Sequence, residues 1–304
     1  MSEHIVLALE GPMMSFGGVA IDNFGVVDDF PGLSMVSGLL GNALGYDRTD
    51  AELLDALQDR LILASVIVRS GSRQRDYQTA RLFEKDMGWT TSGRPEGRAV
   101  SPSFTYDRSY EEETGIRAKT LTHQRYRDYD ADAFVLVAIG FDEADGPTLR
   151  EISDALDKPE RPLFLGRKSN LPVRPLQWRT KDGTKTVEAD DALSACCVVL
   201  SDTETVPAPP PALRARWSST SGPDRLPGEN VELGVPVSGT TILVEGRSKV
   251  HDVRRNVAGV HAGARWVIEG SISVGAMMPD GASVGSDSDQ PMGLPDYTSN
   301  WGDT

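Results

Sequence analysis

Cysteine is scarce in this chain of 304 residues, which contains only Cys196 and Cys197. The apolar sequence around them, SACCVVL, predicts a strand, in which adjacent side chains point to opposite faces. Two adjacent cysteines exclude a disulfide framework and a four-cysteine zinc site, so we expect both thiols to be buried.

Long apolar runs are also missing. No run approaches the roughly 20 residues that span a bilayer, and the N-terminus lacks a basic segment followed by an apolar one. We therefore expect a soluble, cytoplasmic protein. Of the four histidines, His4, His251 and His261 are too dispersed for metal-ligand spacing, so neither a metal nor another cofactor is expected.

Positive charge is in deficit overall, and the formal net charge is -14. Residues 69–127 run against this trend with 12 basic and 8 acidic side chains, whereas residues 1–68 carry 2 and 10. Cations can follow phosphates while aromatic rings stack on unpaired bases, a pattern typical of single-stranded RNA binding. A long surface loop with its own small core is the alternative. The interleaved aromatic residues are Tyr77, Phe83, Trp89, Phe104, Tyr106, Tyr110 and Tyr126.

Acidic residues are absent from residues 161–181, which contain six Lys or Arg. Within this stretch PLFLGRKS places a short apolar run before a Gly-Arg-Lys-Ser turn. A buried strand would then present Arg167, Lys168 and the N–H groups of the turn on one surface. The pattern favours a local polyanion site, although a solvated basic loop is the simpler interpretation.

The order of short strands and helices predicts an α+β protein with a ferredoxin-like βαββαβ domain. A β-rich part follows, with strands at residues 240–245 and 265–274. The expected elements of the first domain are strands at residues 4–10, 61–68, 133–141 and 162–165, and helices at residues 34–44, 51–58 and 148–156.

Composition divides the chain into four parts. Residues 1–203 form the ferredoxin-like domain, with an insertion at about residues 72–126, and residues 204–236 are a Pro/Gly-rich connection. Residues 237–275 are the β-rich C-terminal part. Residues 276–304 contain five Asp and no cation, which predicts a flexible acidic tail.

Seven motifs follow one another along the chain: GPMMSFGG, FPGLSMVSGLLGNALG, RDYQTA, RYRDYDADAFVLVAI, PLFLGRKSNLP, DVRRN and RWVIEGSISV. In this order they resemble the CasD-type RAMP (RRM-like) subunits of the type I-E CRISPR surveillance complex, Cascade. The resemblance extends to about Val274.

The resemblance implies a non-catalytic subunit that holds the 5′ handle of CRISPR RNA (crRNA) in a cytoplasmic ribonucleoprotein complex for antiviral defence. It implies three further partners: the CasC backbone filament, which the subunit caps, the large subunit CasA, and target DNA through the assembled complex. The insertion at about residues 72–126 would be the β-hairpin thumb of this family. A purely structural adaptor with an acidic surface is another possibility.

Residues that match the family's motifs are the expected RNA contacts. They are Arg167, Lys168 and Ser169 of the turn, Arg125, Arg127 and Tyr129, and Arg75 and Tyr77. The start of the first helix departs from the family pattern, because Asp28 and Asp29 precede it and would repel phosphate. Ser34 is the expected N-cap of that helix.

A competing hypothesis is a metal-independent endoribonuclease that processes CRISPR repeat RNA, as some relatives in other type I systems do. Such an enzyme uses a general base on the 2′-hydroxyl and a cation on the scissile phosphate. His123, Lys119 and Tyr126 are the candidates for this alternative. The resemblance is to a type I-E system, in which a separate nuclease, CasE, processes the repeat RNA. This favours the binding role.

Overall fold

The structure is a computed structural model. It describes residues 1–18, 24–47, 49–83, 88–89, 95–96, 105–116, 118–142, 145–207, 209–235, 239–253 and 263–274. Among these residues no helix is long and apolar enough to span a membrane.

Four antiparallel strands form one unit of the main sheet, in the order β13-β1-β12-β6. In chain order its elements alternate as strand, helices, strand, strand, helix, strand, which is the βαββαβ pattern expected from the sequence. Its elements are β1 (Ser2–Glu10), α1 (Leu33–Leu44), α2 (Ala51–Asp59), β6 (Leu61–Arg69), β12 (Phe134–Phe141), α4 (Leu149–Asp157) and β13 (Val187–Ala189).

Both faces of this unit are covered, which explains why β1, β6 and β12 are apolar without alternation. One face packs against α1, α2 and α4. The other packs against α5 (Ala192–Leu200), a helix where we expected a strand. SACCVVL is apolar on every side, so its periodicity cannot separate a buried helix from a buried strand. The missed signal is Asp191, whose carboxylate caps the helix by accepting from the Ser194 N–H at 2.7 Å.

Both cysteines are buried in α5, as expected, and burial raises the pKa of the Cys196 thiol to about 12.

The prediction of a strand at residues 162–165 is wrong. These residues form a loop, in which the N–H of Leu165 bonds to the carbonyl of Asn170 at 2.7 Å. Leu165 is fully buried in the core that also contains residues of α1, α2 and α4. The fourth strand of the unit is instead the short β13, which pairs with the first residues of β1.

The C-terminal strands continue the same sheet, which has eight strands in the order β13-β1-β12-β6-β14-β17-β16-β15. Residues 204–236 are therefore more than the connection we expected, since they contain β14, which pairs with both β6 and β17. The strands are β14 (Ala212–Trp217), β15 (Asn230–Glu232), β16 (Thr241–Val253) and β17 (Gly263–Ser273).

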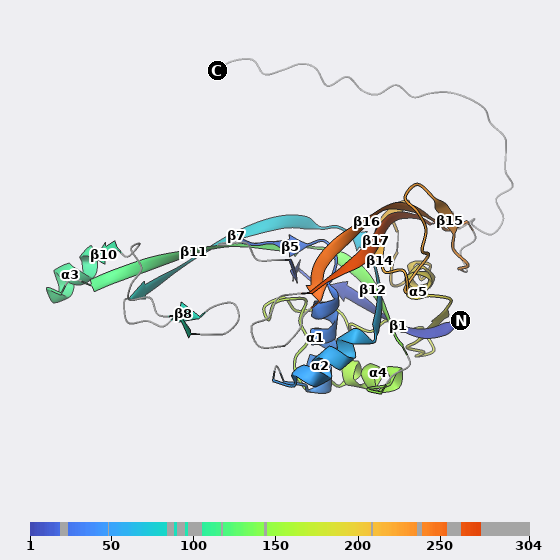
Figure 1. Cartoon of the computed structure of the whole chain (residues 1–304), viewed down its shortest axis with the longest axis horizontal. Coiled ribbons are helices and arrows are strands. Elements are labelled where there is room, and N and C mark those ends of the chain that lie inside the picture. Colours follow the sequence, from blue (N-terminus) through green and yellow to red (C-terminus); the bar gives the residue numbers. More distant parts are fainter. Residues whose placement is uncertain are drawn as a thin grey trace, which may run out of the picture.

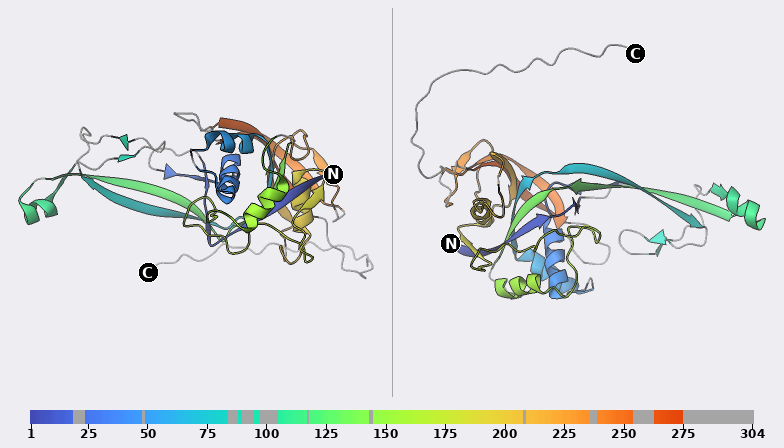
Figure 2. Two further views of the ribbon diagram at one scale, coloured as in Figure 1. Left: turned by 90° about the horizontal axis from the view of Figure 1, so that it is seen from below. Right: turned by 180° about the vertical axis from the view of Figure 1, so that it is seen from behind.

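A long β-hairpin is inserted between β6 and β12 and extends away from the sheet (Figures 1 and 2). Its arms are β7 (Ser72–Phe83) and β11 (Ala118–Ala131), joined by twelve antiparallel pairs. The second arm thus ends later than the expected boundary near residue 126. Short elements lie between the arms or beside the base: β2 (Met13–Met14), β4 (Phe24–Gly25), β8 (Gly88–Trp89), β9 (Pro95–Glu96), β10 (Thr105–Asp107) and α3 (Arg108–Thr114). A small separate ladder joins β3 (Phe16–Gly17) to β5 (Val27–Asp28).

Candidate nucleic-acid interface

The turn at residues 166–169 is held rigidly against the start of the chain. Gly166 has φ of +89°, and a Cβ there would lie 1.8 Å from the carbonyl oxygen of Ser15, so only glycine fits. The buried amide of Asn170 donates to Ser15 Oγ at 2.9 Å and to the Leu165 carbonyl at 3.2 Å. Sequence analysis missed Ser15 and Asn170 as anchors, although Asn170 directly follows the Gly-Arg-Lys-Ser motif.

Arg167 reaches from this turn to the base of the hairpin. Its guanidinium lies 4.3 Å from the centre of the Tyr129 ring and donates to the Asp128 carbonyl at 3.1 Å. Tyr129 is only 9% exposed, so its ring supports Arg167 instead of offering a free stacking surface. Ser169 is exposed and donates to Asn170 Oδ1 at 3.1 Å.

Lys168 lies at a groove beside α1. The groove has a volume of about 690 Å³, and Ser34, Gly38 and Asn42 line it from one face of the helix. These residues follow the i, i+4, i+8 spacing that places side chains in one row. Lys168 is exposed at this groove, whereas Arg161, which also lines it, is paired with Asp47 at 2.8 Å.

Gly38 lines this groove without a side chain, and no packing contact in the described part of the chain requires glycine there. Glycine in a helix interior costs about 0.5–1 kcal/mol relative to alanine, so its presence needs an explanation. Gly41 has one, because a Cβ there would lie 2.5 Å from Leu54 Cδ2 on α2. At Gly38, no other described part of the chain lies within 4 Å of such an atom. The helix could therefore accept a side chain at residue 38, but that side chain would enter the groove.

The hairpin separates the expected RNA contacts onto two faces. Directly opposed residues share a face and successive residues alternate, so Arg125, Arg127 and Tyr129 lie on one face, together with Arg167 of the turn. We call Arg125, Arg127 and Arg167 the cationic face. Arg127 Nε donates to Gln78 Oε1 at 3.0 Å.

The opposite face is aromatic. Phe24 of β4 stacks on Tyr126 of β11, with ring centres 5.0 Å apart and planes at 12°. On β7, the other strand that pairs with β11, the ring centre of Tyr77 lies 5.3 Å from that of Tyr126. Tyr77 is 51% exposed and Phe24 is 40% exposed, so these rings are available for stacking. Sequence analysis missed Phe24, because it reaches the hairpin only through the parallel pairing of β4 with β11.

Arg75 joins the two arms of the hairpin, and the Asp128 carboxylate neutralises its charge. It makes two hydrogen bonds to the buried Asp128 carboxylate, at 2.7 and 3.0 Å, and lies 5.6 Å from the Phe24 ring. The hydrogen bond from Arg75 lowers the pKa of Asp128 and keeps it ionised. By contrast, Arg127, Arg167 and Lys168 form no ion pair with any carboxylate of the described residues, and Asp76, which lies opposite Arg127, accepts a hydrogen bond from Gln78 instead.

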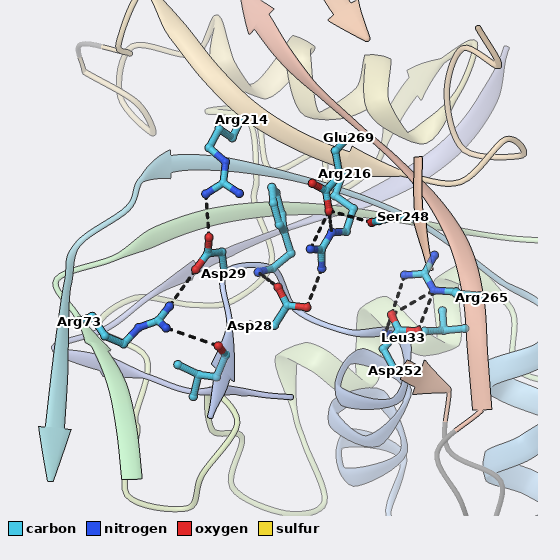
Figure 3. Close-up of polar contacts among 12 residues, drawn as sticks. Asp28, Asp29, Leu33, Arg73, Arg214, Arg216, Ser248, Asp252, Arg265 and Glu269 are labelled. Atoms are coloured by element: carbon cyan, nitrogen blue, oxygen red, sulfur yellow. Dashed lines mark hydrogen bonds and ion pairs between the residues drawn. The ribbon is translucent and has the colours of Figure 1, made fainter. Parts of the chain in front are cut away.

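Asp28 and Asp29 do not form the free negative patch that we expected. Asp29 bridges Arg73 at 2.8 Å and Arg214 at 2.7 Å, and Asp28 pairs with Arg216 at 2.8 Å (Figure 3). Burial opposes ionisation of Asp29, but the hydrogen bonds and charges of Arg214 and Arg73 outweigh it and lower the pKa of this carboxyl. The expectation of repulsion is corrected, because each carboxylate is neutralised by arginines from the hairpin or β14.

The N-terminus of α1 is also occupied. Its N-cap is Gly32, which has no side chain to cap with, and the expected N-cap Ser34 lies inside the helix. The Asp252 carboxylate of β16 accepts from the Leu33 N–H at 3.0 Å and pairs with Arg265 at 2.9 Å (Figure 3). A Cβ at residue 32 would lie 2.7 Å from Asp252 Cβ, so glycine makes room for this cap. A phosphate at this helix end would have to displace a carboxylate.

The residues of the nuclease alternative are only partly described. The side chains of Lys119 and His123 lie outside the described residues, while Tyr126 belongs to the aromatic face. In the part of the chain that the structure describes, no three His, Cys, Asp or Glu side chains are grouped as metal ligands would be.

Comparison with known proteins identifies the family. The family described as CRISPR-associated protein (Cas_Cas5) matches residues 4–268, so the chain belongs to the Cas5 family of CRISPR-associated proteins. It is 29% identical over 185 residues to the CRISPR system Cascade subunit CasD of Escherichia coli (strain K12), covering 58% of this chain and 70% of that protein. A chain of a solved CRISPR RNA-guided surveillance complex has a similar fold, with a TM-score of 0.51 at 18% identity, over 89% of this chain and 91% of that one. The resemblance inferred from the motifs is confirmed.

Proposed function

We propose that this Cas5-family protein is a subunit of a Cascade-type CRISPR surveillance complex that binds the 5′ handle of crRNA without cleaving it. One observation carries the proposal: the rigid turn at residues 166–169 presents Arg167 to the cationic face and Lys168 to the α1 groove. Neither cation pairs with a carboxylate of the described residues. A single RNA strand can therefore cross the turn with phosphates on both sides of it.

The hairpin of β7 and β11 is the proposed thumb. A hairpin that extends from the domain can contact a neighbouring subunit, and we assign that subunit as CasC, with this chain capping the CasC filament. The aromatic face, with Phe24 and Tyr77 exposed, would stack on bases as the RNA bends around the hairpin. We assign CasA as the second protein partner, and target DNA is engaged through the complex.

Filling the α1 groove tests the RNA path. Gly38→Leu is expected to fold normally and to weaken binding of 5′-handle RNA at least about tenfold, or 1.4 kcal/mol, because its side chain enters the groove. The matched control is Gly38→Ala, which is expected to stabilise the protein by about 0.5–1 kcal/mol and to leave most affinity intact. Fluorescence anisotropy and thermal unfolding give the two readouts. Full RNA affinity in Gly38→Leu would show that the groove lies off the RNA path.

Incubation of the purified chain with repeat RNA in chelator separates the binder from the nuclease. We expect the RNA to stay intact, because the type I-E systems that the motifs resemble have a separate processing nuclease, CasE. Discrete products ending in a 2′,3′-cyclic phosphate, lost in His123→Ala while RNA binding persists, would instead assign general-base catalysis to His123.

A further inference from the structure

The hairpin of β16 and β17 is a second basic region that the proposed RNA site does not use. Residues 247–266 contain five Lys or Arg and one acidic residue, Asp252, in a chain whose net charge is -14. The single acid is not free, because Asp252 caps α1 and pairs with Arg265. The segment therefore carries a formal charge of +4, and Asp252 anchors its first described part, residues 247–253, to α1.

Trp266 stands out on this hairpin, because its side chain is 66% exposed. It shares a face of β17 with Ile268 and Ile272, which are buried in the core against α5. A large aromatic ring is therefore left in solvent next to buried residues of the same face.

The residues around Trp266 on the same face are cations. Lys249 is its direct cross-strand partner, and Arg247 lies two residues further along β16, opposite Ile268. Arg247 pairs with Asp224, whereas Lys249 is exposed and makes no ion pair with a described residue. An exposed indole beside a free ammonium suits a π-stacked, negatively charged ligand better than an apolar protein surface.

Rigidity supports a binding role for this face. On the other face of the hairpin, Arg265 is held by Asp252, and Glu269 bonds Arg216 at 2.8 Å and Ser248 at 3.3 Å (Figure 3). These contacts fix the strands to α1 and β14, so Trp266 and Lys249 lie on a fixed surface. Little ordering of the protein is then needed when a ligand binds.

We propose that Trp266 and Lys249 form a second binding surface for single-stranded nucleic acid, separate from the turn at residues 166–169. An unpaired base stacks on the indole of Trp266, and the phosphate beside it lies against Lys249. Stacking on an aromatic side chain tolerates any base, so this contact does not read sequence. The strand has two possible sources in such a complex: the RNA, or a DNA strand separated from its duplex.

Tryptophan fluorescence tests this surface directly. The background variant is Trp89→Phe/Trp301→Phe, whose remaining tryptophans are Trp266 and the buried Trp178 and Trp217. Short oligouridine and oligothymidine are expected to quench its fluorescence. Adding Trp266→Ala should remove the quenching and lower oligonucleotide affinity by about 10- to 100-fold, while Trp266→Phe retains most of the affinity. Lys249→Ala should reduce the salt dependence of binding by about one charge equivalent.

The results distinguish RNA from DNA as the bound strand, and nucleic acid from a protein as the ligand of this surface. Stronger quenching by oligouridine assigns the surface to RNA, stronger quenching by oligothymidine assigns it to DNA, and both support the proposal. The variant Arg167→Ala/Lys168→Ala should bind 5′-handle RNA about 10- to 100-fold more weakly but keep the quenching, so failure of this proposal and failure of the proposed function are distinguishable. No quenching by either oligonucleotide, with unchanged affinity in Trp266→Ala, would overturn the proposal. Loss of a partner subunit alone in Trp266→Ala would overturn it in favour of a protein interface.

Discussion

The double substitution Arg167→Ala/Lys168→Ala is expected to weaken binding of 5′-handle RNA by about 10- to 100-fold. A positioned arginine contact is worth about 1–3 kcal/mol, and Arg167 is positioned by the Tyr129 ring and the Asp128 carbonyl. Two phosphate contacts should also disappear from the salt dependence, so its slope should fall by about one to two charge equivalents. Fluorescence anisotropy over a series of salt concentrations measures both quantities.

The same basic segment supplies a matched control. Arg179 and Lys181 belong to residues 161–181, but Arg179 pairs with Asp157 and Lys181 with Glu204. Arg179→Ala/Lys181→Ala therefore removes the same formal charge from cations that already have carboxylate partners, although Arg179 shares Asp157 with Lys185. Affinity should change less than about threefold, within the range of exposed ion pairs. If both double variants lost the same RNA affinity, only the net charge of the protein would matter, and the turn at residues 166–169 would not be the RNA-binding site.

Arg216→Ala is expected to be the most destabilising substitution in the ion-pair network of Figure 3. Its side chain is only 11% exposed, and it pairs with Asp28 and Glu269, both at 2.8 Å. Removing one partner of a buried ion pair costs about 3–5 kcal/mol, because the remaining charges stay partly desolvated. For a protein of this size, the melting temperature should fall by about 5–10 °C.

Arg214 is the control on the same strand. It is half exposed, and its partner Asp29 keeps Arg73 when Arg214 is removed. Arg214→Ala should therefore cost about 0–1 kcal/mol, as exposed ion pairs do. Thermal and urea unfolding of the two variants give the comparison. If Arg214→Ala lowered the free energy of unfolding as much as Arg216→Ala, the ion pairs of the buried Arg216 would not be the main stabilising contacts of this network.

Elements specified by nearby residues could be predicted from the sequence. The helix at α1 ends at Gly45, whose φ of +83° is the left-handed conformation that glycine commonly adopts just after a helix. The helix at α4 begins at Thr148, which forms a capping box with Glu151. The apolar runs of β1, β6 and β12 are strands because each is long enough for one and bounded by turn residues.

Features that depend on contacts between distant residues could not be predicted. The cap of α1 comes from Asp252, 219 residues away from Leu33. Phe24 joins the aromatic face only through a parallel pairing with β11. The basic composition of residues 161–181 is visible in the sequence, but which of its cations are neutralised depends on carboxylates elsewhere in the fold.

Sequencing the RNA that copurifies with the full chain tests the central claim most directly. The protein is isolated, together with its backbone subunit, from cells that express its own CRISPR array. The proposed function predicts RNA with one defined 5′ end inside the repeat, and ultraviolet crosslinks from the first nucleotides to the turn at residues 166–169. RNA with scattered 5′ ends, or crosslinks that avoid the turn and the α1 groove, would contradict it.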